Sequence, residues 1–153
     1  MAHNPVNHPL RPIYRAIAGI VGVYFIVFGV LGLILTADEG LFGRAGDSVF
    51  GQGTNLFWSI VSIVLGVVVV AATVLGRNRD VLVDTYVGWA LLVIGSFSLA
   101  VIRTDANFLD FSVSTVIVCY LAGLALILAG LYSKTAPMEQ TSEPRQVREG
   151  RTA

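Results

Sequence analysis

The chain has 153 residues, of which 55% are hydrophobic and 13% are charged. A soluble domain carries about 25% charged residues, so the composition excludes an ordinary soluble fold and indicates a membrane protein. Ten basic residues balance ten acidic residues, and this zero net charge argues against nucleic acid as a partner. The single cysteine, Cys119, excludes an intramolecular disulfide.

Four segments contain no charged residue and are long enough to cross a membrane. A transmembrane helix needs about 20 residues, and the uncharged segments have between 18 and 29 residues. We predict helices at residues 16–37, 55–76, 83–102 and 111–133, which together form a transmembrane domain over 16–133. The first apolar run exceeds the core of a cleaved signal peptide, which has about 7–15 residues. The runs also lack the alternation of barrel strands.

The remaining segments flank or connect these helices. Residues 1–15 carry three prolines, which resist helix formation, and form an N-terminal segment. Residues 134–153 lack an apolar run and are typical of a disordered tail. The connections 38–54, 77–82 and 103–110 have 17, six and eight residues. Short connections join antiparallel neighbours, so we predict an all-α membrane protein with a four-transmembrane-helix up-down bundle.

Basic residues are concentrated in alternate connections. The N-terminal segment, the second connection and the tail hold eight of the ten Lys and Arg residues. The other two are Arg44 and Arg103. Cytoplasmic segments carry the excess of basic residues. We therefore expect a multi-pass protein of the bacterial inner (plasma) membrane, with the lipid bilayer as its surroundings and both termini in the cytoplasm.

The two halves of the chain resemble each other. With an offset of 57 residues, "SIVSIVLG" (59–66) aligns with "VIVCYLAG" (116–123). With an offset of 66 residues, the first helix aligns with the third, and Gly29 falls on Gly95. The offsets differ by nine residues, as do the lengths of the first and third connections. The pattern predicts a duplicated helical hairpin with a two-fold axis along the membrane normal.

Small residues lie on one stripe of each predicted helix. Pairs of glycines recur seven residues apart, which is about two helical turns. Helices in lipid gain little from burying apolar side chains, so close backbone approach at small residues carries much of their association. We interpret the stripes as helix-packing seams rather than a ligand groove. The seam residues are Gly22, Gly29, Gly66, Gly88, Gly95, Gly123 and Gly130.

The predicted helices offer few reactive side chains. Both histidines precede the first helix, so neither can ligate haem within the membrane. Cys119 alone cannot form a redox disulfide. Asp84 is the acid nearest a helix interior, and we expect it to pair with Arg77 and Arg79 rather than to relay protons. We expect no catalytic residue, no metal and no cofactor.

The connection between the third and fourth helices is charged. Arg103 suits the negative end of the third helix, and Asp110 occupies the preferred N-cap position of the fourth, with Ser112 as a second candidate. Asp105 and Asn107 supply turn chemistry. We interpret Arg103, Asp105 and Asp110 as caps of an outer hairpin. The alternative interpretation is a cation site. Its further ligands would be Asp38, Glu39 and Asp47.

Several motifs resemble one bacterial family. The segments "GIVGVYFIVFGVLGLI", "NLFWSIVSIVLG" and "YLAGLALILAGLYS" resemble the family called domain of unknown function 4383, over about residues 13–134. The resemblance implies a small four-helix integral membrane protein, of a kind common in actinobacteria, and supplies no activity. Many members carry histidines near the starts of the second and fourth helices. This chain has Trp58, Ser62, Thr115 and Cys119 there, so no metal or haem role is carried over.

Together these observations favour a non-enzymatic accessory or scaffold subunit of a larger membrane complex. Its partners would be other membrane proteins or further copies of the chain. The first connection is longer than adjacent helices need, and long loops commonly carry function. We therefore predict a partner-docking loop that contains Asp38, Glu39, Arg44 and Asp47. The alternative is a small oligomeric transporter or channel.

Overall fold

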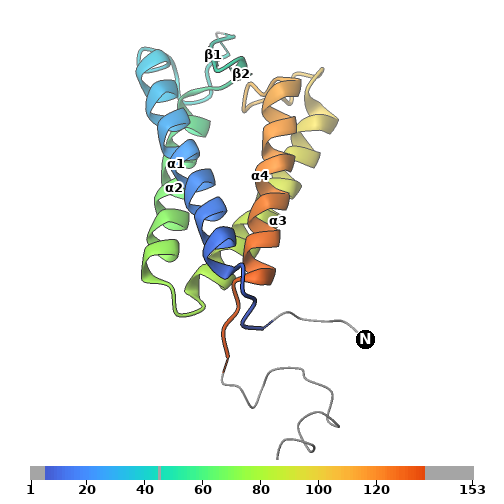
Figure 1. Ribbon diagram of the computed structural model, residues 1–153. Coiled ribbons are helices and arrows are strands. Elements are labelled where there is room, and N and C mark those ends of the chain that lie inside the picture. The colour runs from blue at the N-terminus through green and yellow to red at the C-terminus, as the bar shows by residue number, and fades with distance from the viewer. Residues whose placement is uncertain (1–5, 45, 137–153) are drawn as a thin grey trace, which may run out of the picture.

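A computed structural model describes residues 6–44 and 46–136 of the chain. Four helices make up most of this part. They are α1 (Arg11–Leu35), α2 (Leu56–Leu75), α3 (Arg79–Val101) and α4 (Val113–Tyr132). All four are long and apolar enough to cross a membrane. The chain is therefore an all-α membrane protein, and its helices form an up-down bundle (Figure 1).

Two helices begin earlier than the sequence predicts. Helix α1 begins at Arg11, because Pro12 lies in its first turn, where a missing backbone N–H costs little. Helix α3 begins at Arg79, because the turn before it is very short: Gly76, Arg77 and Asn78 all have positive φ angles. Parts of the predicted N-terminal segment and tail, residues 1–5 and 137–153, lie outside the described residues.

The helices are arranged as two hairpins. Figure 1 shows α1 beside α2 and α3 beside α4, and these two pairs make the most extensive helix contacts. A methyl group on Gly66 would lie 2.5 Å from the carbonyl oxygen of Gly22, and one on Gly123 would lie 2.8 Å from that of Gly88. Such close backbone approach at glycine is typical of helices that pack in lipid.

The buried positions of the second hairpin repeat those of the first. Five of the six buried residues of α1 fall 66 positions before buried residues of α3. All six buried residues of α2 fall 57 positions before buried residues of α4. The contacts repeat as well: Gly66 faces Ile26 of α1, and Gly123 faces Leu92 of α3. The bundle is thus a duplicated hairpin with the same orientation in each half.

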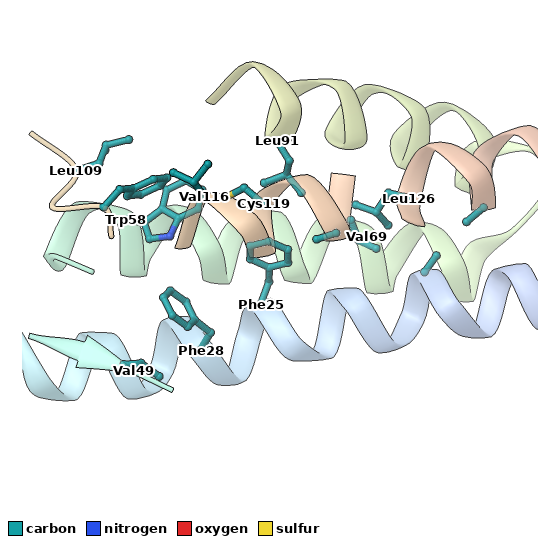
Figure 2. Packing of buried hydrophobic residues seen from close by; sticks show 14 residues of the cluster. Phe25, Phe28, Val49, Trp58, Val69, Leu91, Leu109, Val116, Cys119 and Leu126 are labelled. Atoms are coloured by element: carbon teal, nitrogen blue, oxygen red, sulfur yellow. The ribbon is translucent and has the colours of Figure 1, made fainter. Parts of the chain in front are cut away.

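The centre of the bundle receives one large apolar side chain from each helix. Phe25, Val69, Leu91 and Leu126 lie close to one another in the core (Figure 2) and are at most 4% exposed. Phe25 and Leu91 occupy equivalent positions in the two hairpins, as do Val69 and Leu126. Apolar side chains also cover the outer faces of the helices, where lipid would contact them.

Contact between the two hairpins is less close. At the end of the bundle that holds the long connection, an apolar groove of 470 Å³ lies between α2 and α3, lined in part by Phe57 and Phe97. The equivalent place between α1 and α4 holds two short antiparallel strands, β1 (Ser48–Val49) and β2 (Gln52–Gly53). The strands belong to the long connection, so its extra length fills one of two equivalent spaces.

Candidate functional site

We call the two ends of the bundle the loop end and the termini end. The loop end carries the connections 36–55 and 102–112, and the termini end carries the chain ends and the turn between α2 and α3. Sequence analysis placed the candidate docking and capping residues at the loop end. The structure also gathers buried charges at the termini end, where the sequence had drawn attention to Asp84 but not to Asp80, Arg11 and Arg15.

At the loop end, the strands β1 and β2 are fixed to the helices. Val49 is buried against the core, and the Gln52 side chain donates a hydrogen bond to the Tyr24 hydroxyl of α1. The backbone N–H of Gly53 donates to Ser112 Oγ at 2.9 Å, and Thr115 Oγ1 donates to the Gly53 carbonyl at 2.9 Å. The connection is therefore a folded platform rather than a free loop.

One of the predicted docking residues, Arg44, contacts the other connection. Arg44 forms an exposed ion pair with Asp105 at 3.9 Å and also donates to the Asp105 carbonyl. Asp38 is exposed. Glu39 and Asp47 are half-buried, and partial burial of the Glu39 carboxylate, followed by its proximity to Asp47, raises the pKa of Glu39. Arg44 is thus the predicted docking residue that joins the two connections of the loop end.

The predicted caps of the short connection need correction. Ser112, not Asp110, is the N-cap of α4, and its side chain forms a capping box with Thr115. Asp110 has a φ of 52°, and its carboxylate accepts a hydrogen bond from the Gly46 N–H at 3.2 Å. Arg103 does not lie in the last turn of α3, because that helix already ends at Val101. Asp105 pairs across to the long connection, as described above.

The tip of the platform is exposed beside α1, where the centroid of the Phe50 ring lies 6.4 Å from that of the Tyr24 ring. Phe50 lies at the tip between β1 and β2, is 64% exposed and has a φ of 53°, while the following Gly51 has a φ of 74°. Two consecutive positive φ angles define a type I′ turn, which favours Asn-Gly. A bulky residue in this conformation is strained. The chain therefore presents an aromatic ring where a polar residue would fold more easily.

The termini end contains two fully buried carboxylates in the first turns of α3. Asp80 and Asp84 both have 0% exposure. Arg15 Nε lies 3.1 Å from Asp80 Oδ2, and Arg11 lies 3.6 Å from the same oxygen. Both arginines come from α1, so the ion pairs connect the two hairpins.

The expected pairing of Asp84 with the turn arginines is wrong. Arg77 and Arg79 are exposed, whereas the side chain of Asp84 is directed into the bundle. Both carboxylate oxygens of Asp84 are buried and have no hydrogen-bond partner among the described residues. Asp84 is therefore the buried acid without a bound partner.

The two arginines also bind the other helices. Arg15 donates to the Thr73 carbonyl in α2, and Arg11 Nε donates to the Ser133 carbonyl after α4 at 2.8 Å. The hydroxyls of Thr73 and Ser133 are themselves buried without a partner among the described residues. We call Arg11, Arg15, Asp80 and Asp84, with these two hydroxyls, the termini-end cluster. It joins all four helices.

The chain ends close over this region. The Asn78 side chain accepts from the Thr135 N–H at 2.8 Å and donates to the Thr135 carbonyl at 2.7 Å. His8 packs edge-on against both Tyr14 and Tyr132, whose rings stack with centroids 4.8 Å apart. The first and last described segments are therefore bound to the bundle.

The internal repeat is the signal that could have revealed the cluster from sequence. With the offset of 66 residues, Asp80 falls on Tyr14 and Asp84 falls on Ala18. Ala18, like Asp84, is fully buried. One repeat thus places a carboxylate where the other places a methyl group, which marks a position that has diverged between the halves.

Elsewhere the described residues offer little reactive chemistry. Within 6–44 and 46–136, no three His, Cys, Asp or Glu side chains are grouped so that they could hold a metal ion. Cys119 is a buried free thiol in α4.

Comparison with known proteins identifies one family. The family described as Domain of unknown function (DUF4383) matches residues 15–132, which include most of α1 and all of the other helices. No curated protein and no solved structure matches the chain.

Proposed function

Because this chain belongs to the DUF4383 family, whose description assigns no activity, we propose a function from its geometry: a non-enzymatic accessory subunit of a larger membrane complex. The protein would lie in the bacterial inner membrane with its termini end in the cytoplasm. This orientation follows from the concentration of basic residues in the terminal segments and the α2–α3 turn. The loop end then faces the outside, where a partner can contact it.

The observation that carries this proposal is the exposed aromatic tip of the platform. Strained backbone persists where the surrounding structure maintains it, and such positions cluster at functional sites. Phe50 combines this strain with exposure, while Gly53 and Val49 beside it are firmly held. A rigid platform with an exposed aromatic side chain at its tip is suited to bind a hydrophobic pocket of another protein.

Replacing Phe50 with Asn separates docking from folding. The change creates the Asn-Gly sequence that a type I′ turn prefers, so stability should rise by about 1 kcal/mol. Co-purification of the partner in mild detergent, read by mass spectrometry, should nevertheless be lost. Phe50→Tyr is the matched control, because it keeps the ring and should retain the partner.

A co-purifying protein is accepted as the partner only if it is lost with Phe50→Asn and kept with Phe50→Tyr. It must also co-purify this protein when it is itself used as the bait. If the Asn variant retains every partner, or if the intact protein binds none, the docking proposal fails. These single substitutions disturb the fold less than a deletion of residues 43–51 would, since that deletion would remove the buried Val49.

The proposed orientation has its own test. A reporter inserted at Gly46, which is exposed at the loop end, should behave as external. A reporter fused after the last residue should behave as cytoplasmic. A cytoplasmic signal from the Gly46 insertion would contradict the orientation.

A second candidate function, a small oligomeric transporter or channel, is favoured by the termini-end cluster. Ionisable residues inside membrane helices are costly and usually functional. Asp84 is such a residue. A substrate-dependent flux in liposomes that disappears in Asp84→Asn would support this candidate over the accessory function.

A further inference from the structure

We propose that Asp84 is an exchangeable proton-binding site of the membrane domain, with Arg15 as the cation that faces the carboxylate when the proton leaves. The ligand is a proton supplied by water at the termini end. The proposal concerns the interior of the bundle and is independent of partner docking at Phe50.

The burial of Asp84 favours the protonated form. Its side chain is fully buried, and neither oxygen has a hydrogen-bond partner among the described residues. Removing an ionised carboxylate from water is far more costly than removing a neutral carboxyl group, and buried acids usually respond by binding a proton. Asp80 avoids this cost because two arginines contact it, whereas Asp84 has no ion pair of its own.

The charged neighbours of Asp84 act in opposite directions. Asp80 lies one helical turn earlier on the same buried stripe of α3, and its negative charge disfavours a second one. Arg15 and Arg11 of α1 bring two cations to this cluster, where both contact Asp80. The helices α2 and α4 contribute the uncharged hydroxyls of Thr73 and Ser133. Proton binding at Asp84 thus removes a carboxylate–carboxylate repulsion.

Packing does not account for the carboxyl group. The equivalent position in the first repeat is Ala18, which is equally buried. The bundle therefore accepts a methyl group at this level of the core. A carboxyl group in its place adds an ionisable site to one repeat only.

A route for exchange exists at the termini end. The side chains of Arg11 and Arg15 are 25% and 28% exposed, so the cluster reaches solvent through them. Ser133, which is fully buried, keeps an unpartnered hydroxyl in the same cluster. On release, the Asp84 O–H bond breaks, the proton passes to water at this end, and the new carboxylate faces Arg15.

Infrared spectroscopy of the full chain in lipid nanodiscs tests the proposal. At a pH of about 6, exposed Asp and Glu side chains are ionised. The wild-type protein should nevertheless show the carbonyl band of a protonated carboxyl group, and the band should shift in heavy water. Asp84→Asn should lose this band. Absence of the band in the wild type, or its persistence in Asp84→Asn, would overturn the proposal.

Three further variants guard against indirect effects. Asp84→Ala copies the residue of the first repeat and must give the same loss as Asp84→Asn, with helical circular dichroism confirming that both fold. Arg15→Gln should move the disappearance of the band to a higher pH, because the compensating cation is gone. Arg79→Gln, which changes an exposed cation, should not move it. An unchanged titration in Arg15→Gln would refute the role given to Arg15.

Discussion

The α1–α2 hairpin and the α3–α4 hairpin pack through equivalent glycines, but only the second buries carboxylates. Gly22 meets Gly66 in the first, and Gly88 meets Gly123 in the second. The loops differ as well, since the long connection of the first hairpin builds a strand pair that the second lacks. The shared features are those that membrane packing requires, so the differences indicate where function has been added.

The two differences lie at opposite ends of the bundle. The platform with Phe50 occupies the loop end, and the termini-end cluster occupies the other. Neither is needed for the glycine seams. Breaking each feature separately should therefore show which parts serve the fold and which serve a further role.

The largest effect should come from removing both cations that bind Asp80. The double variant Arg11→Gln, Arg15→Gln leaves that buried carboxylate without a charged partner. Breaking a buried ion pair from one side costs about 3–5 kcal/mol, so the free energy of unfolding in detergent should fall by about that amount. The control, Arg77→Gln with Arg79→Gln, changes two exposed arginines and should shift it by less than about 0.5 kcal/mol. If the two double variants lowered the free energy of unfolding equally, the ion pairs to Asp80 would not stabilise the contact between the hairpins.

Equivalent glycines should differ in their tolerance of a methyl group. A methyl on Gly29 would lie 2.5 Å from the Ser59 carbonyl oxygen, whereas the nearest atom to one on Gly95 is Cys119 Cβ at 3.4 Å. Gly29→Ala should therefore cost about 1–3 kcal/mol through overpacking. Gly95→Ala should change stability by less than about 1 kcal/mol. Thermal unfolding of both variants measures the difference, and a greater loss in Gly95→Ala would contradict the packing described.

The helix caps offer a smaller and finer comparison. Asn55 caps α2 and Ser112 caps α4 at equivalent positions, 57 residues apart. Asn55 also donates to the Phe108 carbonyl at 2.7 Å, so it joins the two connections at the loop end. Replacing a cap by Ala costs about 1 kcal/mol. Both replacements should cost more than this in chemical unfolding, because Asn55→Ala also frees the Phe108 carbonyl and Ser112→Ala also frees the Gly53 N–H. A loss no larger than that of a cap alone in both variants would show that these bonds do not join the two connections.

The sequence was sufficient for features that repeat or that follow from hydropathy. Four uncharged segments predicted the helices, and the glycine offsets predicted the duplicated hairpin. The Asp80 ion pairs could not be predicted, since their arginines lie 65 and 69 residues earlier in the chain, at Arg15 and Arg11. For Asp84, nearness in sequence suggested Arg77 and Arg79, whose side chains the short turn leaves exposed.

The caps show a similar limit. Asp110 and Ser112 are both good N-cap residues, and the prediction from sequence favoured Asp110, which is wrong. The choice depends on the long connection, because the Gly46 N–H binds Asp110 and the Gly53 N–H binds Ser112. Contacts from a distant segment thus decide a local feature.

Paired cysteine cross-linking tests most directly whether the two hairpins have the same architecture. In a Cys119→Ala background, Gly19→Cys with Thr73→Cys joins α1 to α2, and Thr85→Cys with Gly130→Cys joins the equivalent sites of α3 and α4. A methyl on Gly19 would lie 3.7 Å from Thr73 Cγ2, and one on Gly130 would contact Thr85 Oγ1.

Mild oxidation in membranes should cross-link both pairs. Control pairs that move one cysteine of each hairpin by two residues, from Thr73 to Ala71 or from Thr85 to Val83, should remain open, because that shift turns the side chain to another face of the helix. Cross-linking of only one hairpin, or of the control pairs as readily, would contradict the duplicated hairpin on which this account depends.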